Sequence, residues 1–263
     1  MKKIIVTNII LFLTVALFAQ TVRKIGGVED PARIGSVKID SVQSILGINI
    51  NINITVKDID GNIYKTVTIG NQIWMAENLR VTHYPDGTEI LLVTDNTAWA
   101  NLADNNTDEA YCFYGNDNTS DYGLLYTFAA TIAVNWGKDN AVNQGVCPDG
   151  WHIPNNAEWD ELNNYLGGST VAGGKLKETG TTHWNSPNTG ATNESGFTAI
   201  GNGYRRYSDG NFYSLKQINN IWSATELNST IAYYYQFRDN NSQFIREENG
   251  TKSHGFSVRC LKD

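Results

Sequence analysis

Two cysteines stand at positions from which a disulfide bond would close much of the chain. Cys147 comes just before a Pro-Asp-Gly turn and the start of a helix, and Cys260 lies three residues before the C-terminus. In an exported protein such a pair is expected to be oxidised, and across so long a loop the bond contributes about 4 kcal/mol. Cys112 is either a buried free thiol or a competitor for Cys147, and the sequence leaves that connectivity open.

The remaining reactive residues do not assemble into a catalytic or metal-binding pattern. No two of the histidines have helical spacing and none has a cysteine close by, so no zinc template is present; they are His83, His152, His183 and His254. Ser195 and Ser223 lack the Gly-x-Ser-x-Gly context of a hydrolase nucleophile. Glu158 already has a structural role as a helix cap. We therefore expect no enzyme activity, no metal and no cofactor.

One acidic segment, Asp58-Ile-Asp-Gly-Asn62, has two interpretations. Oxygen ligands at alternate positions could begin a calcium loop, but the position that would supply the final glutamate is Ile69. Asp-Gly is also the residue pair that a tight hairpin turn favours, because glycine adopts positive φ without strain. The sequence favours a turn between strands that end at Val56 and begin at Tyr64.

The N-terminus has the features of a secretory signal. Lys2 and Lys3 precede an apolar run from Ile4 to Phe18, and Ala19 gives a small residue at the cleavage point. This run is shorter than the ~20 residues that a spanning helix needs. We therefore predict a signal peptide over 1–19, export to the periplasm, cell surface or medium, and no membrane insertion after cleavage.

Composition narrows the choice of partner. The formal net charge is −7, and it becomes −9 once Lys2 and Lys3 are removed. Phosphate contacts require a basic face, so we do not expect nucleic-acid binding. Tyrosine, tryptophan and asparagine are abundant, as they are in many extracellular binding surfaces. The oligomeric state is not indicated by the sequence.

The elements that must position these residues follow from periodicity. An N-terminal arm over 20–56 contains one strand, in which isoleucine and asparagine alternate from Ile48 to Val56. Asn155 and Glu158 form a capping box for a helix that runs to Leu166 and stops at two glycines.

Further elements are predicted from shorter patterns. The apolar run 124–134 suits a buried helix, and a second short helix over 171–178 would point Lys175 and Lys177 outward. The last part of the chain indicates three strands, over 232–237, 243–246 and 255–260.

Seven motifs follow one another along the chain: Asp58–Tyr64, Ile69–Leu79, Cys147–Pro154, Ala172–Glu178, Ala191–Thr198, Trp222–Glu226 and Gly255–Cys260. Together they resemble the Fibrobacter succinogenes major paralogous domain family, and they would make 57–263 one such domain. Two of them, around Trp151 and before Cys260, are also similar to formylglycine-generating, sulfatase-modifying enzymes. That similarity implies an α+β, C-type-lectin-like fold: an irregular mixed domain with short antiparallel strands, two or three short helices and long loops.

The same resemblance bears on activity. The sulfatase-modifying enzymes need a cysteine pair for copper, and here pairing of Cys147 with Cys260 would leave Cys112 alone. The Glu-Pro-Asn, Gln-Pro-Asp and Trp-Asn-Asp motifs of calcium-dependent lectins are also missing. The similarity therefore implies the fold without the oxidase chemistry.

Lectin-like folds place ligand contacts on the loops and strands that precede the last strand. In this chain that region contains aromatic and hydrogen-bonding side chains, although the aromatic ones could equally fill the core. The candidates are Trp222, Tyr233, Tyr235, Arg238, Asn240, Asn241 and Arg246. The leading hypothesis is a non-catalytic binding or adhesion module for a surface polysaccharide. The alternatives are a structural or assembly component that meets an envelope protein, and a divergent relative of the sulfatase-modifying oxidases.

Overall fold

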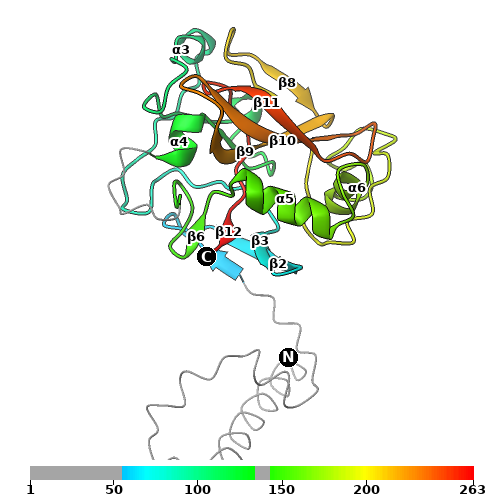
Figure 1. Ribbon diagram of the computed structural model, residues 1–263. Helices are drawn as coiled ribbons and strands as arrows, with labels where there is room; N and C mark the ends of the chain where they lie inside the picture. Colours follow the sequence, from blue (N-terminus) through cyan, green and yellow to red (C-terminus); the bar gives the residue numbers. More distant parts are fainter. Residues whose placement is uncertain (1–54, 134–142) are drawn as a thin grey trace, which may run out of the picture. The chain divides into compact units, whose positions relative to one another are not determined.

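The computed structural model describes residues 55–133 and 143–263, and their strands form two larger sheets and a short ribbon (Figure 1). The architecture is α+β, with strands predominating over short helices. The signal peptide predicted over 1–19 and most of the arm predicted over 20–56 lie outside the described residues.

The first sheet is antiparallel and joins the beginning of the described chain to its end. Its strands lie in the order β1-β2-β3-β12-β6. They are β1 (Thr55–Lys57), β2 (Ile63–Ile69), β3 (Gln72–Met75), β12 (Leu261–Lys262) and β6 (Trp151–His152).

The segment between β1 and β2 is the predicted turn. The Asp58 carboxylate accepts hydrogen bonds from the Asn62 backbone N–H at 2.9 Å and the Asn62 amide at 2.8 Å. It also accepts one from the Tyr64 hydroxyl at 2.6 Å. Gly61 adopts φ +88°, a conformation that glycine takes without strain. The acidic side chain thus stabilises the hairpin by satisfying donors within and beside the turn.

The second sheet has the order β11-β10-β9-β7-β8 and is antiparallel except where β7 meets β9. Its strands are β11 (Ile245–Thr251), β10 (Ile231–Arg238), β9 (Ile218–Glu226), β7 (Asn202–Arg205) and β8 (Phe212–Leu215). The strand predicted over 232–237 is confirmed as part of β10. The prediction over 243–246 is corrected, because β11 begins at Ile245 and extends to Thr251.

The apolar run 124–134 begins as a strand and not as the predicted helix. Leu124–Tyr126 forms β5, which pairs with β4 (Tyr111–Phe113). Only then does the side chain of Thr127 accept a hydrogen bond from the Ala130 N–H and start α4 (Phe128–Ile132). A buried strand and a buried helix are both continuously apolar, so the partner strand decided the outcome. Two other short helices, α3 (Asn96–Ala100) and η2 (Tyr114–Asn116), belong to the connecting loops.

The predicted capping box is confirmed at the start of α5 (Asn156–Tyr165). The Asn155 side chain accepts from the Glu158 N–H, and the Glu158 carboxylate accepts from the Asn155 N–H at 2.8 Å. Trp159 then packs against the first sheet, 4.5 Å from Trp74, and against the second, 5.1 Å from Tyr235. In Figure 1, α5 accordingly lies between β3 and β10. Its apolar face is therefore a joint between the two sheets.

The second predicted helix exists as α6 (Ala172–Leu176), but Lys177 does not point outward. Its side chain is buried, and its ammonium donates to the carbonyl oxygens of Thr189, Arg238 and Asn241 at 2.8–3.0 Å. A buried ammonium is stable only when its donors are satisfied, and three carbonyls satisfy them. Charge alone suggested a surface position, and the loops that converge on α6 decided otherwise.

Arg205 and Arg259 are also buried, and like Lys177 they donate hydrogen bonds to backbone carbonyl groups. Arg205 donates to the carbonyls of Val93, Thr94 and Gly210, and its guanidinium lies 4.4 Å from the centre of the Trp99 ring. The loop before α3 is therefore held by a side chain from the second sheet.

Arg259 lies near the C-terminus and is likewise buried. It donates to the carbonyls of Met75, Phe197 and Thr198, and to the side-chain oxygen of Asn78. These contacts tie the first sheet to the loop before β7.

The segment predicted as a strand over 255–260 is an extended connection between the sheets. Its carbonyl groups accept hydrogen bonds from Trp222 in the second sheet and from Leu79 beside the first, at 3.1 and 2.9 Å. Because the segment makes only a few hydrogen bonds to each sheet, it does not form a continuous ladder of backbone hydrogen bonds with either. The strand β12 begins only at Leu261. The predicted disulfide joins Cys147 to Cys260, which leaves Cys112 as a buried free thiol.

We predict that replacing both Cys147 and Cys260 with serine lowers the free energy of unfolding by about 4 kcal/mol, because the bond constrains a separation of 113 residues in the unfolded chain. Urea unfolding of the oxidised protein, the reduced protein and the double variant measures the effect. Equal unfolding midpoints for the oxidised protein and the variant would contradict it.

A second prediction concerns the buried ammonium. Lys177→Met should cost about 3 kcal/mol of stability, because three carbonyls lose their donor in the protein interior. Lys175→Met is the matched control, since Lys175 forms only a partly exposed pair with Glu194 and should change stability by less than ~1 kcal/mol. Similar losses for the two variants, measured by thermal and urea unfolding, would exclude the proposed role of Lys177.

Candidate functional site

The most enclosed histidine is part of the scaffold. His152 places Nδ1 2.7 Å from the Asp263 carboxylate and Nε2 2.8 Å from the Glu158 carboxylate. Burial disfavours the charged ring, but these two hydrogen bonds outweigh burial and raise the pKa of His152 above 6.5. Both ring nitrogens are occupied, so the imidazole holds the C-terminal residue to the start of α5 and has no free nitrogen for a substrate.

The other histidines are also engaged. His183 contacts Glu178 at 2.8 Å and Asp121 at 3.1 Å, and His83 contacts Asp60 at 2.6 Å. Burial lowers the pKa of His254 to about 4, which leaves this ring neutral at physiological pH. Over residues 55–133 and 143–263, no group of three His, Cys, Asp or Glu side chains is placed to hold a metal ion.

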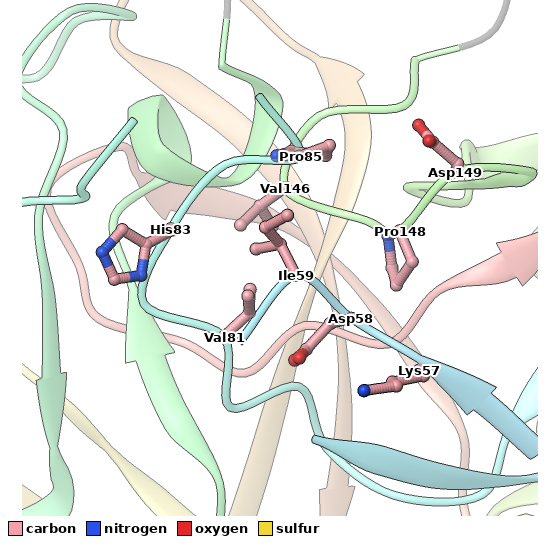
Figure 2. Close-up of a pocket in the computed structure, with 9 residues that line it drawn as sticks. All are labelled: Lys57, Asp58, Ile59, Val81, His83, Pro85, Val146, Pro148 and Asp149. Carbon is pink, nitrogen blue, oxygen red and sulfur yellow. The ribbon is translucent and has the colours of Figure 1, made fainter. Parts of the chain in front are cut away.

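A small hollow lies beside the β1–β2 turn (Figure 2). Its volume is about 230 Å³, and it is lined by apolar groups of Ile59, Val81 and Val146. Lys57 and Asp149 lie at its margin. The oxygens of Asp58, which also lines it, are already bonded within the turn. This hollow is small, and no tyrosine, tryptophan or phenylalanine is among its lining residues.

Two larger hollows flank α5 and share the lining residues Asp160 and Asn164. We refer to them together as the α5 groove. The first hollow, of about 690 Å³, lies between α5 and the β2–β3 turn. The second, of about 600 Å³, lies between α5 and the start of β11. Asp160 and Asn164 therefore stand between the two hollows, and each hollow has a larger volume than the one in Figure 2.

The first hollow contains an exposed aromatic ring on a fixed support. Tyr165, the last residue of α5, is 65% exposed. A Cβ atom at Gly70 would lie 2.9 Å from the Tyr165 ring, so the ring rests directly on the glycine of the β2–β3 turn. Gly70 also adopts φ +61°, where a side chain would be strained. One part of the ring is thus supported by the turn, and the remainder is open to solvent beside Asn71 and Asn164.

The second hollow combines an aromatic floor with charged margins. Tyr235 and Phe244 stack with ring centres 5.0 Å apart, and both are almost fully buried. Above them Arg246 pairs with Asp160 at 3.0 Å, which links β11 to α5. Burial raises the pKa of the Tyr235 hydroxyl, so this group stays protonated and acts as a neutral hydrogen-bonding group. The hollow can accept polar groups at its margins, whereas the two rings of its floor leave almost no exposed surface for a ligand.

The structure separates the seven ligand-binding candidates. Trp222 is 0% exposed, and its indole N–H donates to the Tyr126 carbonyl at 2.9 Å, so it is a core residue and the expected ligand contact is corrected. Tyr235 and Arg246 line the second hollow, although the Tyr235 ring is buried within its floor.

The four other candidates have local roles. Tyr233 is half-buried, and its ring lies 5.9 Å from the Arg246 guanidinium. Arg238 and Asn241 supply carbonyls to the buried Lys177, and Asn240 accepts a hydrogen bond from the amide of Asn241. Tyr233 and Arg238 belong to β10, and Asn240 and Asn241 follow it, so the structure does not bring all seven side chains to one surface.

Sequence reasoning missed the residues that α5 and the β2–β3 turn contribute. Tyr165 lies outside the apolar face that Trp159, Leu162 and Leu166 define, and an aromatic residue on the polar side of an amphipathic helix is a usable signal. Its proximity to Gly70 could not be read from the sequence, because it depends on how the helix packs against the first sheet.

We predict that the His152 contacts stabilise the fold most between pH 4.5 and 6.5. The raised pKa of His152 means that its contribution is complete below 6.5 and disappears as pH rises through the raised value. Hydrogen bonds from His152 and the Asn155 N–H outweigh burial and lower the pKa of Glu158, so its contribution is lost as pH falls below 4.5.

Urea unfolding of the parent protein and His152→Gln, repeated from acidic to mildly alkaline pH, measures this dependence. The difference in unfolding free energy between the parent and the variant should be largest between pH 4.5 and 6.5 and should decrease below and above that range. A difference that does not change with pH would contradict the assignment.

Comparison with known proteins places the chain in a family. The sequence model of the Fibrobacter succinogenes major domain matches residues 67–262, which is most of the chain. No curated protein and no solved structure matches it. Over the described ranges, no helix combines the length and apolar character needed to cross a membrane. The matched region includes the disulfide, α5 and both hollows of the α5 groove, and the chain belongs to the Fibrobacter succinogenes major domain family.

Proposed function

We propose that this protein is an exported, non-catalytic binding module that holds a surface polysaccharide in the α5 groove. The observation that carries the proposal is the Tyr165 ring, which is 65% exposed and rests on Gly70. An exposed aromatic face on a rigid support favours stacking with the apolar face of a sugar ring, because little conformational freedom is lost on binding.

The groups around Tyr165 suit a hydroxyl-rich ligand. Asn71 and Asn164 line the same hollow as the ring, and an amide both donates and accepts hydrogen bonds. The second hollow continues past Asp160 and adds Arg246 and the Asn163 amide. A chain of several sugar units would therefore meet one stacking surface and polar side chains on both sides of α5.

The proposal also includes the cellular location of the protein. Disulfides form in oxidising compartments, so the Cys147–Cys260 bond supports export. We place the module at the cell surface or in the periplasm, and we include in the proposal the C-type-lectin-like form of the fold.

We predict that Tyr165→Ala lowers the affinity for a polysaccharide ligand by about tenfold or more, which corresponds to ~1.4 kcal/mol. The ligand is found by screening the exported chain on arrays of neutral, acidic and amino-bearing glycans, with calcium and with a chelator. Affinity is then measured for the parent and the variant by titration calorimetry.

Tyr207→Ala is the matched control, because Tyr207 is an exposed tyrosine that lies outside the α5 groove and is 39% exposed. This variant should bind as the parent does. An array without any bound glycan would overturn the proposed function, and equal binding by the Tyr165→Ala variant would overturn its assignment to the α5 groove.

A further inference from the structure

We propose that the α5 groove selects uncharged or amino-bearing polysaccharides and rejects chains that carry carboxylate or sulfate groups. This inference rests on the proposed function and names the chemical class of ligand that the groove accepts. It follows from the charges that line the two hollows and from the hydrogen-bonding groups that remain available there.

Acidic side chains outnumber basic ones in the groove. Its charged lining residues are Asp160, Glu161, Arg246 and Glu248. Arg246 is already paired with Asp160 at 3.0 Å, so the one cation at this site is largely neutralised. Glu161 and Glu248 are both exposed, and among the described residues neither lies within ion-pair distance of a cation, although the charge of Glu248 also acts on Arg246. The groove therefore presents a net negative field to a ligand.

The available hydrogen-bonding groups point in the same direction. Ionised carboxylates only accept hydrogen bonds, so Glu161 and Glu248 require donors from the ligand. Sugar hydroxyls, amines and N-acetyl N–H groups supply such donors, whereas a uronate or sulfate supplies further acceptors.

The position of the charges makes the repulsion local. The carboxylates of Glu161 and Glu248 lie in different hollows: Glu161 lines the first hollow together with Tyr165, and Glu248 on β11 lines the second. An extended anionic chain would meet both. Like charges in such a complex are unfavourable, and at exposed positions the effect is weakened by salt.

The chain offers a matched test of this inference. Glu247 neighbours Glu248 on β11 but is not among the residues that line the second hollow, since side chains alternate along a strand. Glu89 is exposed and lies outside both hollows. Glu161→Gln with Glu248→Gln, and Glu89→Gln with Glu247→Gln, therefore remove equal charge inside and outside the groove.

The probes are cello-, xylo- and manno-oligosaccharides, each compared with its carboxymethylated form by titration calorimetry. The parent protein should bind the neutral form at least about tenfold more tightly, which corresponds to ~1.4 kcal/mol. The groove variant, Glu161→Gln with Glu248→Gln, should reduce this ratio of affinities to less than about threefold. The control variant, Glu89→Gln with Glu247→Gln, should show the same ratio as the parent. Higher salt should narrow the ratio for the parent.

The outcomes separate the two proposals. If neither these probes nor any glycan on the array binds, the proposed function fails and this inference fails with it. If the carboxymethylated probes bind as tightly as the neutral ones, the charge selection is wrong while the binding function stands. Equal narrowing by the groove and control variants would mean that net charge, and not the groove, discriminates.

Discussion

The fold depends on buried cations that hydrogen-bond to backbone carbonyl groups of irregular segments. Much of the described part of this chain lies outside helices and strands, and a buried carbonyl without a donor costs about as much as a lost hydrogen bond. Lys177, Arg205 and Arg259 each donate to two or more such carbonyls. In this way long loops acquire fixed positions without a regular hydrogen-bonded ladder.

Those fixed loops allow α5 to act as the joint between the sheets. Trp159 contacts Trp74 on one side and Tyr235 on the other, and the Gln72 amide donates to the Glu158 carbonyl at 2.9 Å. The same helix carries Tyr165 and Asp160 on its outer side. The groove therefore lies on the outer side of a helix whose inner side packs against both sheets.

Patterns of local origin were predictable from the sequence. The capping box of Asn155 and Glu158 involves residues three apart, and the Asp58 turn is closed by its own neighbours. Lys177 and Trp222 were misplaced because their environments are assembled from distant segments. A lysine is ordinarily exposed and a tryptophan can either stack or pack, so residue type does not settle the matter. The candidate site was anticipated only in Tyr235 and Arg246, whose groove is completed by α5.

The sequence by itself determined the family, the start of α5 and the predominance of short strands, because each is encoded by residues close together or by a distinctive motif, whereas the structure decided that Cys147 pairs with Cys260 and that Cys112 stays free. Tertiary structure alone decided which cations are buried, where Leu124–Tyr126 finds its partner strand and where Tyr165 meets Gly70. The physical reason is that a carbonyl, a strand edge and a glycine become specific partners only when packing brings distant segments into contact.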